Sequence, residues 1–91
     1  MSLLLITYEH KTEGKDYTSF FEEIKKNSNG WWHYLDKTWV SNTTLSADAF
    51  ARKLFPYITQ KDRLMIFKLQ EDYQGWLPEE AWKWFDDKNF N

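Results

Sequence analysis

The sequence predicts one small α+β domain in which two helices cover one face of a four-stranded antiparallel sheet. Two observations predict this class. The chain has 91 residues, which is enough for one hydrophobic core and too few for two. Its apolar residues switch along the chain between the continuous runs typical of strands and the three-to-four-residue spacing typical of helices.

The N-terminal third of the chain predicts a strand, a loop and a helix. Residues 3–8 form an apolar run typical of a central strand, and the polar residues 9–15 that follow predict a loop. A helix is expected from Asp16, which is a candidate N-cap, to about Asn27. Its apolar face repeats at i, i+3, i+4 and i+7 in Tyr17, Phe20, Phe21 and Ile24.

The middle of the chain predicts a hairpin, a second helix and a last strand. Residues 31–35 and 38–42 are rich in aromatic and β-branched side chains on either side of a short polar break. Ser46 is expected to cap the second helix and Pro56 to end it near Phe55. Strict alternation along the first hairpin strand points Trp31, His33 and Leu35 to one face and Trp32 and Tyr34 to the other.

Residues 71–91 differ in charge composition from residues 1–70, which form the predicted domain. They carry two bases and six acids, whereas residues 1–70 carry ten bases and eight acids. Pro78 and the acids after it predict the start of a short helix with a broad apolar face. Because two helices cover only one sheet face, we expect this Trp-rich extension to pack on the other face or on a partner protomer.

The predicted order β-α-β-β-α-β, with right-handed crossovers, leads to a ferredoxin-like sandwich. The segments LLITYE (4–9), WWHYLDKTWVSN (31–42) and DRLMIFKL (62–69) resemble the family of the small second CRISPR-associated acquisition protein. They resemble the SinR-like proteins grouped with that family more closely still. The resemblance implies a homodimer formed through the sheet, in a CRISPR-related or mobile-element setting, often with the segment after the last strand added to the partner's sheet.

The same resemblance implies one alternative activity. In that family an aspartate at the end of the first strand, one from each protomer, binds a divalent metal for nuclease activity, and the matching residue here is Glu9. Paired Glu9 residues across the dimer axis would hold Mg²⁺ or Mn²⁺ for cleavage of RNA or DNA. Glu9 and His10 are then the catalytic candidates, with Asp36 of the hairpin as an expected neighbour. Otherwise these three are solvated loop residues. Since glutamate displaces the carboxylate by about a bond length, we expect a binding protein without a cofactor.

Two kinds of binding surface are predicted. Four cations are candidates for contacts with a phosphate backbone, namely Lys37, Arg52, Lys53 and Arg63. Large amphipathic side chains are candidates for an interface within a homodimer or with another protein, namely Trp31, Trp32, His33, Tyr34, Trp76, Leu77, Trp82, Trp84 and Phe85. A homodimer is the expected assembly, with nucleic acid or a second protein as the possible further partner.

Composition excludes several other classes. The absence of cysteine removes disulfides and thiolate metal sites, and no glycine-rich loop for a nucleotide cofactor is present. No apolar run approaches the roughly 18 residues of a membrane span, and residues 1–8 lack the basic start of a signal peptide. We therefore expect a cytoplasmic protein without membrane contact.

Overall fold

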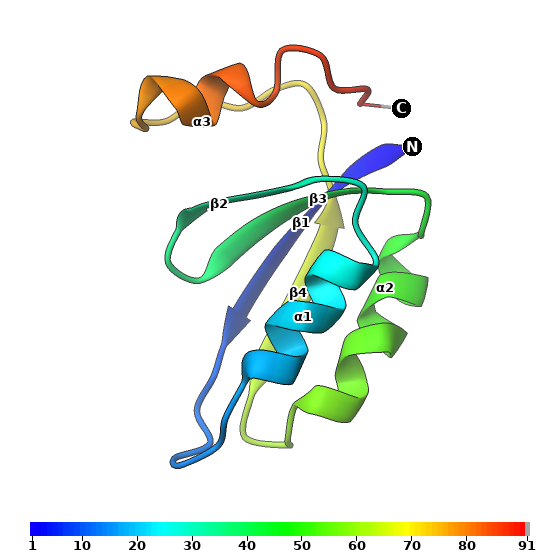
Figure 1. Cartoon of the computed structure of the whole chain (residues 1–91), viewed down its shortest axis with the longest axis vertical. Helices are drawn as coiled ribbons and strands as arrows, with labels where there is room; N and C mark the ends of the chain where they lie inside the picture. Colours follow the sequence, from blue (N-terminus) through cyan, green and yellow to red (C-terminus); the bar gives the residue numbers. More distant parts are fainter. Residues whose placement is uncertain (91) are drawn as a thin grey trace.

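A computed structural model describes residues 1–90 of the chain and confirms the α+β class (Figure 1). Within these residues, one four-stranded antiparallel sheet combines with three α-helices. The elements follow in the order β1 (Ser2–Glu9), α1 (Thr18–Lys26), β2 (Trp31–Leu35), β3 (Thr38–Thr43), α2 (Ala47–Leu54), β4 (Arg63–Lys68) and α3 (Glu79–Lys83). A short 3₁₀ turn (Phe55–Tyr57) follows α2.

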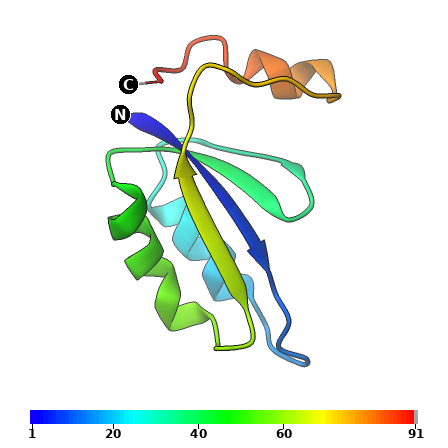
Figure 2. The ribbon, with the colours of Figure 1, turned by 180° about the vertical axis from the view of Figure 1, so that it is seen from behind.

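The strands lie in the order β2-β3-β1-β4, so that β2 and β4 are the two edges. Leu5 of β1 is opposite Val40 of β3 on one side and Phe67 of β4 on the other. Helix α1 connects β1 to β2 across β3, and α2 connects β3 to β4 across β1. Seen from behind, β1 and β4 lie in front of α1 (Figure 2). Helices α1 and α2 pack in one cluster with the same side chains of β1, so both share one side of the sheet.

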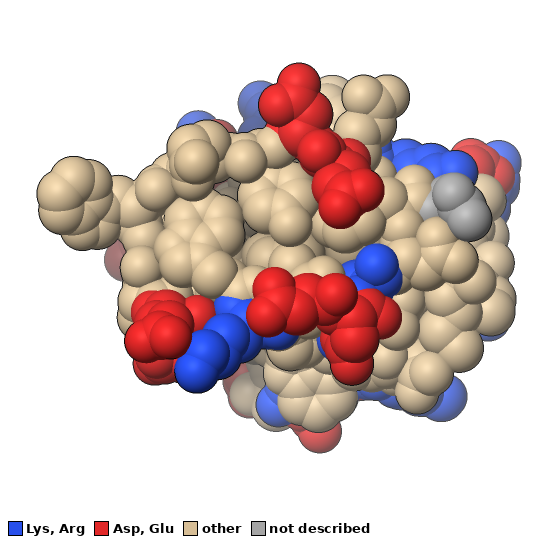
Figure 3. Space-filling view, turned by 90° about the horizontal axis from the view of Figure 1, so that it is seen from above, with Lys and Arg blue, Asp and Glu red and all other residues tan. Residues whose placement is uncertain are grey.

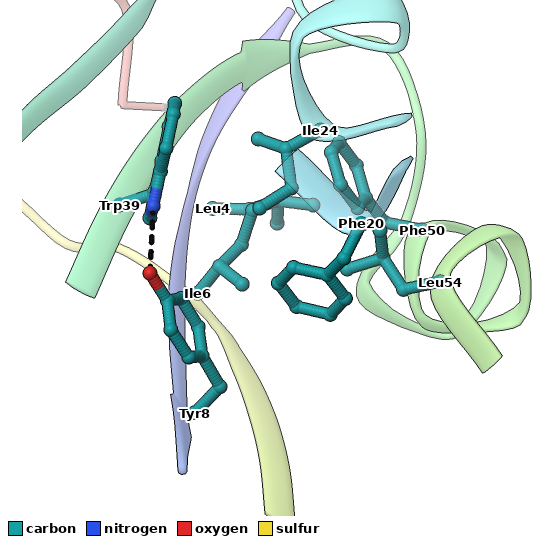
Figure 4. Close-up of a cluster of buried hydrophobic side chains, with 8 residues drawn as sticks. All are labelled: Leu4, Ile6, Tyr8, Phe20, Ile24, Trp39, Phe50 and Leu54. Atoms are coloured by element: carbon teal, nitrogen blue, oxygen red, sulfur yellow. Dashed lines mark hydrogen bonds between the residues drawn. The ribbon is translucent and has the colours of Figure 1, made fainter. Parts of the chain in front are cut away.

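The main core lies between the sheet and these two helices (Figure 4). Its buried side chains are Leu4, Ile6 and Tyr8 of β1, Phe20 and Ile24 of α1, Trp39 of β3, and Phe50 and Leu54 of α2. Its polar atoms are paired, since the indole Nε1 of Trp39 donates a hydrogen bond to Tyr8 Oη at 3.0 Å. The helical spacing read from the sequence therefore marks the face that α1 and α2 turn to the sheet.

The helix ends follow local side-chain chemistry, with one difference. Ser46 caps α2 as predicted, because its side chain accepts a hydrogen bond from the backbone N–H of Ala49 at 3.1 Å. Asp16 was expected to cap α1, but the helix begins only at Thr18 and has no side-chain cap. Asp16 instead accepts bonds from the N–H and the hydroxyl of Thr18, which close the turn before the helix.

A β-bulge in β2 corrects the predicted alternation of that strand. Trp32 is opposite Val40 and Leu35 is opposite Thr38, so three steps along β2 match two along β3. The extra residue turns the strand over, as bulges do. Leu35 therefore lies on the same side of the sheet as Trp32, and the prediction that they face opposite ways was wrong.

The second face of the sheet carries a smaller core made with the C-terminal segment. Leu3, Trp32 and Val40 of the sheet pack against Ala81 and Phe85, and all five side chains are buried. Trp32 Nε1 also donates to the backbone oxygen of Ala81 at 3.0 Å. Residues 69–90, named the tail below, cross above the β2–β3 hairpin and return toward the start of β1 (Figure 1). In residues 1–90 no helix has the length and apolar character needed to cross a membrane.

Candidate interaction surface

Two rows of side chains cross all four strands on the second face of the sheet. The first row runs through Trp32, Val40, Leu5 and Phe67, and the second through Leu35, Thr38, Thr7 and Met65. Neither row contains a charge. The tail covers Trp32 and Val40 of the first row and leaves Leu5 partly exposed and Phe67 half exposed.

The open part of these rows forms an apolar strip, defined here as Leu5, Leu35, Met65 and Phe67. The exposed fractions are 47% for Leu35, 55% for Met65 and 52% for Phe67. Edge strands often carry charged side chains that prevent association with another chain. Met65 and Phe67 are uncharged, although they belong to edge strand β4. An uncharged, half-exposed strip across a sheet is the kind of surface that marks an interface.

An apolar hollow of about 160 Å³, named the tail groove, lies where the strip meets the tail. Leu5, Trp32 and Leu35 form its sheet side, and Tyr73, Leu77 and Trp82 form its tail side. Thr38 and Gln74 are its polar residues. The groove therefore joins the tail and the strip into one continuous surface.

Trp76 stands at the rim of this groove with its side chain in solvent. It is 99% exposed, although Gln74 before it and Leu77 after it both line the groove. The backbone N–H of Gly75 donates to Gln74 Oε1 at 3.1 Å, which shapes the turn that presents Trp76. Of the large apolar side chains in residues 1–90, Trp76 is the one that the fold buries least.

The other predicted interface residues take part in packing within the protomer. His33 stacks on Trp39 with 4.1 Å between ring centroids, and Tyr34 packs against Trp32 at 5.4 Å. Trp31 is 43% exposed beside Lys25, whose Nζ lies 5.6 Å from the ring centroid. Two further rings, Trp84 and Phe85, pack edge to face in the tail.

The structure separates the two residues predicted for catalysis. Glu9 ends β1 opposite Arg63 on the second face of the sheet, where its carboxylate is 3.4 Å from Lys11 Nζ. His10 turns to the helix side and stacks on Tyr17 with ring centroids 3.6 Å apart. Across residues 1–90, no three histidine, aspartate or glutamate side chains gather into a set that could hold a metal ion.

Asp36 lies near the end of β1 through its backbone. Its carbonyl accepts a hydrogen bond from Tyr8 Oη at 3.4 Å and lies 3.2 Å from His33 Nε2. The backbone N–H of Tyr8 also donates to the carbonyl of Lys37 at 3.3 Å. The hairpin turn and the end of β1 are therefore neighbours, as the sequence analysis expected, but through main-chain atoms.

The four predicted phosphate-binding cations lie on different parts of the molecule. Lys37 is in the hairpin turn, Arg63 begins β4 on the second face, and Arg52 and Lys53 lie on α2. Arg52 is held by Asp48 one helical turn earlier, with 3.0 Å between Nε and Oδ2. Seen from above, on the side of the tail, acidic side chains predominate (Figure 3). The structure thus does not gather these cations into one patch.

Asp62 is a buried polar residue that the sequence analysis did not single out. The residue is only 6% exposed. Its carboxylate accepts hydrogen bonds from Tyr17 Oη at 2.7 Å, Lys11 N at 2.8 Å, Thr59 N at 2.9 Å and Thr12 Oγ1 at 3.2 Å. Burial alone would raise the pKa of Asp62, but these bonds, led by the one from Tyr17, hold it well below its usual range. Asp62 therefore ties the loop after β1 to the turn before β4.

Comparisons with protein-family models, with curated proteins and with solved structures found no match for this chain.

Proposed function

We propose that this protein is a homodimeric binding domain of ferredoxin-like architecture that acts by contact and not by catalysis. The apolar strip is the observation that carries the proposal, because it leaves three large side chains half exposed in two side-chain rows that contain no charge. The strand order supports the ferredoxin-like assignment, since β3 separates the parallel strands β1 and β2, and β1 separates β3 from β4.

A second copy of the chain fits this surface better than an unrelated partner does. A two-fold interface must be complementary to itself, and an uncharged strip meets that condition against its own image. The charges at the end of the strip, Glu9 and Arg63, are opposite in sign and lie side by side, so a second copy can meet each with its opposite. The resemblance to the SinR-like proteins implies the same mode of assembly through the sheet.

The oligomeric state of charge-bearing variants tests this proposal. We expect the wild-type protein to sediment as a dimer and Phe67→Glu to sediment as a monomer, because the variant places a charge within the apolar strip. Phe55→Glu is the matched control, since Phe55 is 55% exposed in the 3₁₀ turn after α2 and outside the strip. A wild-type monomer, or equal effects of the two substitutions, would contradict the proposal.

The distribution of charge favours a protein over a nucleic acid as any further partner. Phosphate-backbone binding needs several cations on one surface. The candidates Lys37, Arg52 and Arg63 belong to separate elements, and residues 71–91 carry six acids and only two bases. In fluorescence anisotropy with single-stranded DNA and RNA we expect weak binding. Tight binding that weakens steeply with salt and is lost in Arg63→Glu would reverse this choice.

Metal-dependent cleavage of RNA or DNA is the second candidate function. One observation favours it: Glu9 lies on the same face as the apolar strip and at its end, so that a dimer formed through the strip brings both copies of Glu9 to the border of the interface. Nuclease activity that requires Mg²⁺ or Mn²⁺ and disappears in Glu9→Gln would establish it. Activity that survives this substitution would remove Glu9 from the chemistry. A CRISPR-related or mobile-element setting belongs to the homodimer proposal and rests on the sequence resemblance, and a cytoplasmic location is part of the same homodimer proposal.

A further inference from the structure

We propose that Trp76 of each protomer inserts its indole ring into the tail groove of the dimer partner. This inference rests on the proposed homodimer and names the side chain and the hollow that hold it together. It makes Trp76 the anchor of the interface and the tail groove its receptor.

Trp76 is the large apolar side chain that would bury the most additional surface against a partner. It is 99% exposed, and an aromatic side chain buries about 150–250 Å² when it is covered. Its neighbours Gln74 and Leu77 face the groove while Trp76 does not. The turn therefore holds the ring outside its own groove and presents it to another molecule.

The tail groove has the size and chemistry of a site for one ring system. Its volume of about 160 Å³ is similar to that of the roughly 150 Å³ apolar cavity that takes up benzene in another protein. Trp32, Tyr73 and Trp82 line it with aromatic surface.

Anchor and receptor occur on the same chain and next to each other, which identifies a second copy as the occupant. In a two-fold dimer each protomer supplies both parts, so two insertions form at once. A foreign chain that entered the groove would leave Trp76 in water.

The exposed area fits the same conclusion. Trp76 together with the half-exposed Leu35, Met65 and Phe67 and the ring of Tyr34, which is 41% exposed, presents roughly 600–700 Å² of apolar surface. A standard interface buries about 800 Å² on each partner. The surface is therefore large enough for a stable dimer once the backbone around these side chains is included.

Two variants and their mixture test the insertion. Trp76→Ala removes the anchor and keeps the groove, whereas Thr38→Phe fills the groove from its sheet side and keeps the anchor together with the Gly75–Gln74 bond that shapes its turn. We expect the loss of one insertion to raise the dissociation constant of the dimer about thirtyfold, as truncation of a tryptophan anchor does. A homodimer of either variant lacks both insertions. Trp31→Ala, which removes another exposed tryptophan, is the matched control and should leave the dissociation constant unchanged.

An equal mixture of the two variants retains one insertion per mixed dimer, because an intact Trp76 meets an intact groove. We therefore expect the mixed dimer to be about thirtyfold tighter than either homodimer and to exceed its statistical share in native mass spectrometry. N-acetyltryptophanamide should fill the groove and dissociate the wild-type dimer.

Three outcomes would overturn the inference. A Trp76→Ala protein that dimerises like wild type, while Phe67→Glu is monomeric, refutes the insertion and leaves the proposed homodimer standing. A wild-type monomer at concentrations up to about 1 mM refutes both. If N-acetyltryptophanamide binds without weakening the dimer, the groove belongs to a small ligand or a foreign chain and not to Trp76.

Discussion

The hydroxyl of Tyr17 donates a hydrogen bond to the carboxylate of Asp62 at 2.7 Å, across 45 residues of sequence. The same Tyr17 oxygen accepts a bond from the backbone N–H of Thr12 at 3.1 Å. The pair thus joins the start of α1 to the turn that leads into β4. Since β1 and β4 are adjacent strands, this contact holds together the end of the molecule opposite the tail.

Replacing Asp62 by alanine should cost about 2–3 kcal/mol of unfolding free energy at pH 7. The reason is that the side chain of Asp62 pairs with four donors, which the substitution leaves without a partner in a buried place. Urea unfolding at pH 7 measures this value. Asp48→Ala, which removes an exposed partner of Arg52 on α2, is the control and should change stability by less than about 1 kcal/mol.

The contribution of Asp62 should also depend on pH. Its pKa in the folded protein lies below the ordinary aspartate value, so the ionised form stabilises the fold above pH 4, and this contribution is lost as pH falls toward the folded pKa. The difference in stability between wild type and Asp62→Asn should therefore shrink when urea unfolding is repeated at pH 3. A difference that is the same at pH 7 and pH 3 would show that the charge of Asp62 has no part in it.

His10 is enclosed by rings from two elements. It lies between Tyr8, with centroids 4.3 Å apart, and Tyr17, at 3.6 Å. Its buried Nε2 has no hydrogen-bond partner among the described residues. Burial lowers the pKa of His10, and the nearby charges of Lys15 and Lys37 act in the same direction, while Asp62 opposes them.

The stability of the protein should therefore fall on mild acidification through His10. A histidine whose folded pKa lies below its unfolded value of about 6.5 is fully compatible with the fold above that value, and its protonation destabilises the fold as pH decreases below it. His10→Phe keeps the stacked ring and removes the titration. We expect its unfolding free energy to vary less between pH 7 and pH 5 than that of wild type.

His33→Phe is the control for this comparison, because His33 is the other histidine of the chain and lies exposed on β2. We expect it to retain the pH dependence of wild type. At pH 7, His10→Phe should be at least as stable as wild type, since it removes a buried nitrogen without a partner. If His10→Phe and wild type lose stability in parallel on acidification, His10 is not the responsible group.

Sequence analysis succeeds here where local chemistry decides the structure. The cap at Ser46 and the stop before Pro56 follow from the preferences of single residues, and α2 spans Ala47–Leu54 accordingly. The hairpin follows from two aromatic strands separated by two polar residues. The apolar faces of α1 and α2 follow from spacing alone, because both helices pack on one sheet.

Features that depend on pairing between distant segments are not encoded in this local way. The bulge in β2 is set by the register against β3, so Leu35 was assigned to the wrong face. The environment of Asp62 comes from residues up to 51 positions away in the chain. The tail groove forms only when the tail reaches the sheet, which is why Trp76 could be singled out from the sequence but its receptor could not.

Trp32 fastens the tail to the sheet through one buried hydrogen bond. Its Nε1 donates to the carbonyl of Ala81 at 3.0 Å, and both residues are almost completely buried. Trp32→Phe keeps a ring in place but leaves this carbonyl without its partner. We expect a loss of about 2 kcal/mol in unfolding free energy and faster amide exchange at Phe85, whose N–H is bonded to Trp82 within the tail.

Trp31→Phe provides the comparison for this last prediction, because Trp31 is the adjacent residue of β2 and is 43% exposed. It should change stability by less than about 0.5 kcal/mol, as exposed substitutions usually do, and leave exchange at Phe85 unaltered. The two variants separate anchoring of the tail from general loss of a tryptophan. Equal exchange rates at Phe85 in both would mean that the tail is held by apolar packing of Ala81 and Phe85 alone, with no contribution from the indole bond.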